Sequence, residues 1–220
     1  ADRGVQGLRV RWSPDFGFAA VDPDVQSSTL DAVKVFGELG AEVEDVSISF
    51  EKSPLDAFWT MFSALSVFRY SDAVGDRTDL LTDYTRAWFK DGAEFTASEY
   101  VGALGERDRF IATFADVFEN YDLIVTPSVA TTAFPVGDPP GIIDGREVEP
   151  FWGYVQFSAV INLIGYCAAS IPCGFDSEGL PIGLHIIGRP GDDATVLAMA
   201  RASWRLAASS TVTEKMRSEP

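Results

Sequence analysis

A strand, a helix, a glycine and a second strand open the chain, and this order constrains the fold more than any other feature. Apolar residues alternate along 8–12, recur at helical spacing along 24–39 and follow an extended pattern along 43–48. Asp22 can cap the helix, and Gly40 can end it. A strand, a crossover helix and a second strand of these lengths predict a parallel βαβ unit, and therefore an α/β fold.

Helical and extended segments continue to alternate after this unit. Residues 53–120 are expected to form a helical insert, helical throughout. Three helices are expected there, one from Ser53-Pro54, one over about 78–90 and one from the capping-box sequence at 96–99. Further strands are expected at 122–126, 168–173 and 182–188, and further helices at 153–164 and after Asp192 or Asp193. The turn at 176–179 makes the last two strands antiparallel, which predicts a mixed β-sheet.

No internal repeat or low-complexity linker divides the chain, so residues 1–220 are expected to form a single α/β domain with a mixed sheet and flanking helices. A hydrophobic content of 46% is enough for one substantial core. The long stretch at about 128–150 is rich in Gly and Pro and is expected to be a flexible loop. It is interpreted either as a flap over a pocket or as a disordered connection.

Charge and residue usage narrow the class of protein. The formal net charge of −16 opposes binding to phosphate backbones and anionic membranes, so neither nucleic acid nor membrane is expected as a partner. No apolar run approaches the roughly 20 residues that span a bilayer. Cys167 and Cys173 would lie about 20 Å apart in an extended strand, which predicts two reduced core thiols and a cytoplasmic chain. The polar opening residues do not resemble a signal peptide and, without a starting Met, are expected to mark either an artificially chosen boundary or a processed end.

Site motifs of the common kinds are missing from the sequence. It contains no Gly-rich phosphate loop and no G-x-S-x-G elbow, and one His with two Cys cannot supply a usual zinc site, so no cofactor and no metal are expected. His185 alternates with apolar neighbours and is interpreted as a structural sheet histidine. The four lysines are expected on polar surfaces or in the tail, at positions 34, 52, 90 and 215. No catalytic residue is therefore assigned in this chain.

One segment resembles a known family. Residues 157–175 read FSAVINLIGYCAASIPCGF, and after a short turn residues 180–190 read LPIGLHIIGRP. These are similar to the C-terminal hallmark of the amidase signature family. The strand ending in Thr126-Pro127, and Gly7-Leu8-Arg9-Val10 with residues 21–25, also resemble that family in the same order. The match extends across most of the chain and implies the C-terminal part of the amidase signature fold.

The chain departs from the family pattern at several positions. Val160 and Cys167 stand where the family has Pro, and His185 stands where it has Gln. Glutamine-acting amidotransferase subunits often carry an acidic pocket residue just before the Phe of the hallmark, whereas residues 154–156 are uncharged here. This difference favours an apolar or aryl amide over glutamine as the substrate.

The resemblance implies a Ser–cis-Ser–Lys hydrolase of small amides. In the family a Lys acts as the base, a bridging Ser relays the proton and a second Ser attacks the carbonyl, and all three come from the N-terminal half. Ser158 and Ser170 are not assigned to these roles; Ser170 is interpreted as a structural hydroxyl inside a core strand. The C-terminal half would supply much of the substrate pocket, for which the candidate residues are Trp59, Phe62, Thr126, Pro127, Phe157 and Asn162.

Three hypotheses remain open at this point. The chain is the C-terminal portion of an amidase whose N-terminal half lies in cis, a subunit of a split amidase with that half in trans, or a non-catalytic binding module. The first two predict an inactive isolated chain with an exposed sheet edge, which would need its partner half or would form homo-oligomers.

Overall fold

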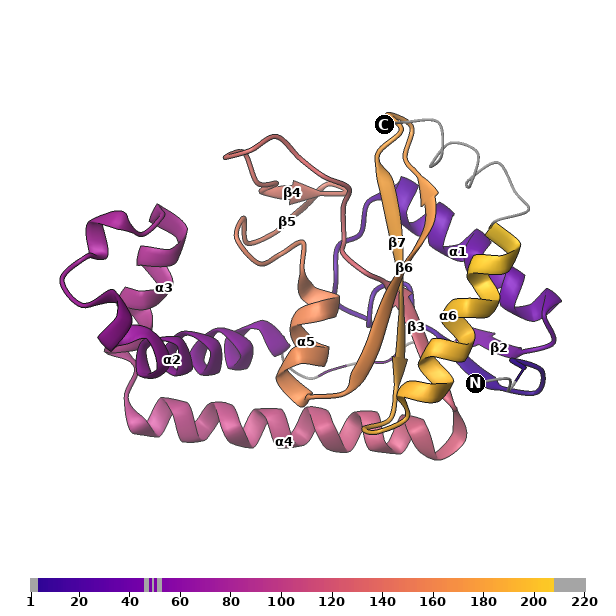
Figure 1. Ribbon diagram of the computed structural model, residues 1–220, viewed down its shortest axis with the longest axis horizontal. Coiled ribbons are helices and arrows are strands. Elements are labelled where there is room, and N and C mark those ends of the chain that lie inside the picture. The colour runs from indigo at the N-terminus through magenta and orange to yellow at the C-terminus, as the bar shows by residue number, and fades with distance from the viewer. Residues whose placement is uncertain (1–3, 46–47, 49, 51–52, 208–220) are drawn as a thin grey trace.

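A five-stranded mixed sheet lies at the centre of the computed structural model, which describes residues 4–45, 48, 50 and 53–207, with side chains as far as Ser203 (Figure 1). The strand order is β2-β1-β3-β7-β6. The strands are β1 (Arg9–Trp12), β2 (Glu42–Asp45), β3 (Leu123–Pro127), β6 (Cys167–Phe175) and β7 (Pro181–Gly188). β1 pairs in parallel with β2 and β3, whereas β7 is antiparallel to both β3 and β6. The predicted βαβ unit, the mixed sheet and the antiparallel last pair are confirmed.

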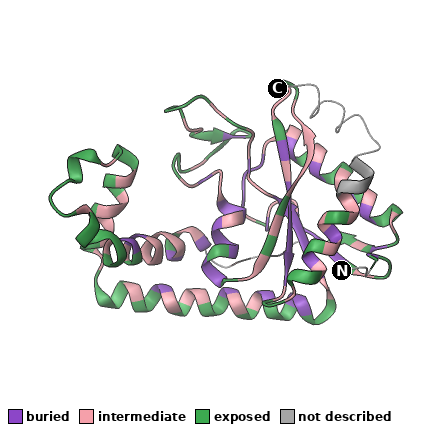
Figure 2. Ribbon diagram, in the orientation of Figure 1, coloured by how far each residue is buried: buried purple, intermediate pink, exposed green. Residues whose placement is uncertain are grey.

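Helices cover both faces of this sheet. α1 (Pro23–Glu38) and α6 (Asp193–Ala207) pack on one face, and α4 (Ala97–Asn120) and α5 (Gln156–Ile164) lie on the other (Figure 1). Strand alternation divides the core accordingly: Leu123 and Val125 belong to the cluster under α1 and α6, and Ile124 to the cluster with α4 and α5. The most buried residues are concentrated in β3, β7 and α5 (Figure 2).

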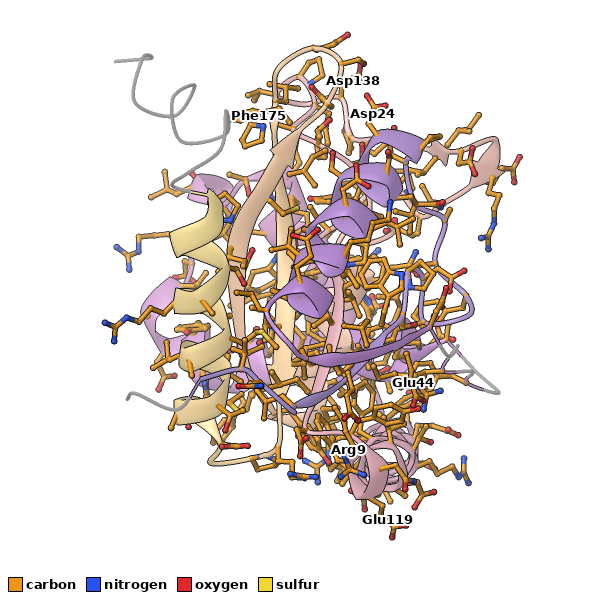
Figure 3. The ribbon with its side chains drawn as sticks, turned by 90° about the vertical axis from the view of Figure 1, so that its right-hand side faces the viewer. Arg9, Asp24, Glu44, Glu119, Asp138 and Phe175 are labelled. Carbon is orange, nitrogen blue, oxygen red and sulfur yellow. The ribbon has the colours of Figure 1, made fainter. Side chains whose placement is uncertain are left out.

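Local capping residues set the helix starts as predicted. The Asp22 side chain accepts from the Asp24 backbone N–H, and Ser53 accepts from Leu55. Thr96 and Glu99 form the reciprocal capping box of α4. The start of α1 also lies beside the tip of the β6–β7 hairpin, near Phe175 (Figure 3), where the Asp24 carboxylate accepts from the Ser177 backbone N–H at 2.8 Å. Hydrogen bonds between near neighbours in the sequence thus fix the helix starts, and the bond between Asp24 and Ser177 joins α1 to the hairpin.

The helical insert is not continuous. It comprises α2 (Pro54–Val74), a single 3-10 turn η1 (Thr78–Leu80), α3 (Asp83–Glu94) and α4. The chain turns at Gly75, whose φ is +51°, a conformation that favours glycine. The prediction of helix throughout 53–120 was therefore wrong at these breaks, and the second helix begins at Asp83 rather than near 78. α2 and α3 form an arm that extends to one side of the sheet (Figure 1).

Smaller differences concern the loop and the element ends. Within 128–150 the chain forms a short hairpin, β4 (Ile142–Ile143) and β5 (Arg146–Glu147). The Arg146 guanidinium donates to the backbone carbonyls of Phe18 and Ala19 at 2.8 and 3.0 Å, which attaches this hairpin to the core. The helix expected from 153 begins at Gln156. Part of the strand expected at 43–48, residues 46 and 47, lies outside the described residues.

β6 forms one edge of the sheet. Of the described strands, only β7 pairs with it. Its nine residues, CAASIPCGF, are mostly apolar, yet each is only partly buried or exposed. Ser170 is exposed, so its interpretation as a residue inside a core strand was wrong. A long, apolar edge of this kind is a template for pairing with further chain.

Candidate functional site

A cavity of about 700 Å³ opens between the helical arm and the segment before α5. Its wall comes from the start of α2, from α3 and from residues 149–152. The lining residues are Ser53, Leu55, Asp56, Trp59, Thr60, Ala87, Asp91, Phe95, Glu149, Phe151 and Trp152. A volume of this size fits a small organic ligand, and an apolar wall with a few polar groups is typical of such sites.

Trp152 is the centre of the aromatic wall. Its ring lies 5.2 Å from that of Trp59, 5.3 Å from Phe58 and 5.6 Å from Phe62, all on α2. It also lies 5.7 Å from the ring of Tyr84 on α3. Edge-to-face pairs at such distances add to the burial of apolar area and hold the rings in defined orientations. The segment before α5 is therefore joined to the arm by ring contacts.

Carboxylates hold parts of this wall. The Trp59 indole N–H donates to Asp91 Oδ2 at 3.1 Å, which joins α2 to α3. The Trp152 backbone N–H donates to Glu149 Oε2 at 2.6 Å. Burial first, and then the neighbouring Tyr154 and Glu149, raise the pKa of Tyr84 to about 12. The phenol is thus neutral at physiological pH, and its ring contacts Trp152 of the wall.

The six candidate pocket residues do not lie together. Trp59 lines the cavity, and Phe62 supports it from behind through Trp152. Thr126 and Pro127 are buried at the C-terminal end of β3. Phe157 is fully buried and packs against Phe16 at 5.5 Å between ring centroids, whereas Asn162 is exposed on α5. The last four lie outside the cavity wall.

A row of polar side chains crosses the sheet at Thr126, one of the candidate pocket residues outside the cavity wall. Thr126 of β3 pairs in register with His185 of β7, which pairs with Ser170 of β6. The Ser170 hydroxyl is 2.6 Å from that of Ser128. Burial lowers the pKa of His185 to about 4, and its Nδ1 atom is buried without a hydrogen-bond partner among the described residues. A neutral, buried imidazole agrees with the prediction of a structural sheet histidine.

The described lysines and cysteines are not placed as a general base or a thiolate nucleophile. Lys34 pairs with Asp31 on the surface, and Lys90 is exposed. Lys52 and Lys215 lie outside the described residues. Burial raises the pKa of Cys173 to about 12 and also raises that of Cys167, so both free thiols stay protonated at neutral pH.

The Ser158 hydroxyl bonds to the Val155 carbonyl, which is a structural role. Within the described ranges, no three His, Cys, Asp or Glu side chains gather closely enough to hold a metal ion. No helix there is long and apolar enough to cross a membrane.

Comparison with known proteins places this fold in a family. Residues 3–197 match the model of the Amidase family. The chain belongs to the amidase signature family. A subunit of glutamyl-tRNA(Gln) amidotransferase from Listeria innocua is 33% identical over 224 residues, covering 90% of this chain and 45% of that protein. This amidase signature chain therefore spans about half the length of the curated relatives it matches.

Solved structures of amidase signature proteins have the same fold and superpose on this chain to different degrees. A bacterial aryl acylamidase of the amidase signature family superposes with a TM-score of 0.87, at 25% identity, over 100% of this chain and 47% of that chain. The corresponding glutamyl-tRNA(Gln) amidotransferase subunit from Thermotoga maritima gives a TM-score of 0.64 at 24% identity over 94% of this chain and 44% of its own.

Of the eleven residues that line the cavity, Trp59 alone was among the six candidate pocket residues. Phe151 and Trp152 lie between the loop expected at about 128–150 and the helix expected from 153, whereas Asp91 and Phe95 belong to α3 and its C-terminal cap. The adjacent aromatic pair was the one available signal, since two large rings in a Gly- and Pro-rich segment must pack on something.

Proposed function

We propose that this amidase signature chain is the substrate-pocket portion of an amide hydrolase, and that the N-terminal half of the fold supplies the Ser–cis-Ser–Lys triad in cis or in trans. The observation that carries the proposal is the aromatic-walled cavity of about 700 Å³, which the chain forms from its own residues. Both described lysines are exposed, so neither has the buried surroundings that would make a lysine a general base at neutral pH.

The cavity favours an amide that carries an aromatic ring. Trp59, Phe151 and Trp152 offer ring faces and edges to a flat apolar group. The similarity to a bacterial aryl acylamidase at a TM-score of 0.87 supports this substrate class. Thr126, Pro127, Phe157 and Asn162 are kept as a second set of candidate substrate contacts, nearer the sheet.

The edge of β6 fits the position at which the missing half would join. A further strand paired there would cover the exposed Ala168 and Ser170 and would bring new residues beside the polar row that ends at Ser170. The Lys and the two Ser of the family would then act as base, proton relay and nucleophile, with backbone N–H groups stabilising the oxyanion.

The test compares this chain alone with the same chain combined with an N-terminal half of the amidase signature fold, joined to it in one polypeptide or added as a second one. Hydrolysis of an anilide is followed by the release of the aniline, and we expect turnover only from the joined protein. In that protein Trp59→Leu should raise KM for the anilide several-fold. Phe68→Leu is the matched control, because Phe68 lies on the same helix but is 85% exposed.

Each outcome has a separate meaning. Hydrolysis by the chain alone would contradict the assignment of catalysis to another segment. Binding of the anilide by the joined protein without hydrolysis would favour a non-catalytic binding module.

A further inference from the structure

Three carboxylates lie on the wall of the aromatic cavity. They are Asp56 on α2, Asp91 on α3 and Glu149 before α5, so they come from three separate segments. The described lining includes no Lys or Arg, and none of the ion pairs formed among described residues involves these three groups. Among the described residues, the wall therefore carries about three negative charges that no Lys or Arg of the lining balances.

Aromatic rings accompany these charges. The wall also presents Trp59, Phe95, Phe151 and Trp152. The face of an aromatic ring is the negative end of its quadrupole and attracts a cation within about 6 Å of its centre. Ring faces and carboxylates together thus favour the same sign of charge in a ligand, and the net charge of −16 on the whole chain adds to this field.

The arrangement also decides between kinds of cation. A metal ion needs several oxygen atoms converging at about 2.0–2.6 Å, and the described carboxylates do not gather in that way. Carboxylates distributed around a cavity of about 700 Å³ suit a larger organic cation, whose apolar part contacts the rings while its ammonium group faces the acids. An anionic ligand would be repelled, and a neutral one would leave the charges unbalanced.

We infer that this cavity binds an organic ammonium ion carrying an aromatic or other apolar group, which makes the substrate an amide with a cationic amino substituent. The second part of this inference rests on the proposed function. Asp91 has a double role, because it accepts from the Trp59 indole and keeps a second carboxylate oxygen for the ligand. Glu149 uses one oxygen for the Trp152 backbone N–H in the same manner.

The test uses three ring-matched probes that differ in charge: benzylammonium, benzyl alcohol and benzoate. Binding to the full chain is measured by tryptophan fluorescence, which Trp59 and Trp152 make sensitive to the cavity. We expect benzylammonium to bind at least about fivefold more tightly than benzyl alcohol, benzoate to bind most weakly of the three, and added salt to reduce the preference.

The variants Asp91→Asn and Glu149→Gln keep the hydrogen-bond acceptor and remove the charge. Each should weaken benzylammonium binding by about fivefold and leave benzyl alcohol unchanged. Asp116→Asn is the control, since Asp116 is an exposed helical acid outside the cavity wall and should change neither probe.

Equal affinity for benzylammonium and benzyl alcohol would overturn the inference. So would an equal loss of binding in the Asp116→Asn control. Because binding is read on this chain alone and hydrolysis on the joined halves, a cavity that takes neutral anilides without preferring cations would refute the inference and leave the proposed function standing. Hydrolysis by the chain alone would refute the proposed function without affecting the charge preference.

Discussion

Gly92→Ala should destabilise the arm that bears the cavity. A Cβ atom at position 92 would lie 2.3 Å from the carbonyl oxygen of Ser63 and 2.8 Å from Cγ2 of Val67, because α3 packs closely on α2 there. The first contact is roughly 1 Å shorter than ordinary van der Waals contact, and a backbone atom cannot rotate away. Overpacking of this kind costs about 1–3 kcal/mol of unfolding free energy. The gain in helix propensity from Gly to Ala, about 1 kcal/mol, offsets part of it.

The variant Gly102→Ala on α4 separates the steric clash at position 92 from the gain in helix propensity. A Cβ atom there meets nothing within 4 Å, so this variant should be stabilised by up to about 1 kcal/mol. The propensity gain is common to both variants, and the difference between them therefore reports the clash, about 1–3 kcal/mol. Urea unfolding followed by circular dichroism gives the two free energies. Equal stabilisation of both variants would refute the close approach of α2 and α3.

Tryptophan fluorescence of the two variants gives a local check on the packing of α2 and α3. Asp91, next to Gly92, accepts from the Trp59 indole, so separation of the helices should break this bond in Gly92→Ala and leave it intact in Gly102→Ala. A shift of Trp59 emission in the first variant alone is the expected result.

Further perturbations test the core, a helix start and the thiols. Burial lowers the pKa of His185 to about 4, whereas this imidazole in the unfolded chain has a pKa of about 6.5. When the pH falls from 7 to 5, only the unfolded state takes up the proton, so the unfolding free energy should fall by about 2 kcal/mol. In urea titrations His185→Gln should lose this pH dependence. Thr96→Ala should lower the unfolding free energy by about 1 kcal/mol through the capping box, whereas Ser98→Ala, exposed and without that role, should not. Burial raises the pKa of both Cys167 and Cys173, so a thiol reagent at mildly alkaline pH should react slowly with the folded protein and fast in denaturant; rapid reaction of the folded protein would contradict the burial of Cys173.

The features that the sequence predicted correctly are those decided over a few residues or by strand alternation. Asp22, Ser53 and Thr96 cap helices through bonds to backbone groups two or three residues away, so the sequence alone carries the information. The mixed sheet followed from a crossover helix at one end and a short turn at 176–179 at the other.

The features that the sequence could not predict depend on distances between remote segments. The break of the insert after α2 uses a positive φ at Gly75, and Gly is also compatible with helix, so spacing alone did not mark it. Trp152 packs on Trp59, 93 positions earlier in the chain. Aromatic residues around much of α2 indicated only that something covers it, and its partner was decided by the tertiary fold.

The polar row across the sheet indicates where the chemistry of the proposed enzyme would be completed. Thr126 is fully buried, His185 is 7% exposed and Ser170 is exposed, so exposure increases from β3 through β7 to the edge strand β6. A sheet that ended here as a finished unit would place apolar residues inward and would protect its edge with charges or a covering element, yet β6 carries no charged residue. Under the proposed function, pairing with the N-terminal half would bury Ser170 beside the catalytic groups.

Ser170→Ala and Ser170→Lys separate this role from a purely structural one. Removal of the hydroxyl should affect turnover in the joined protein more than stability, whereas the lysine, by charging the edge, should prevent the two halves from joining and leave the fold of this chain intact; halves that join despite the lysine would place the junction elsewhere.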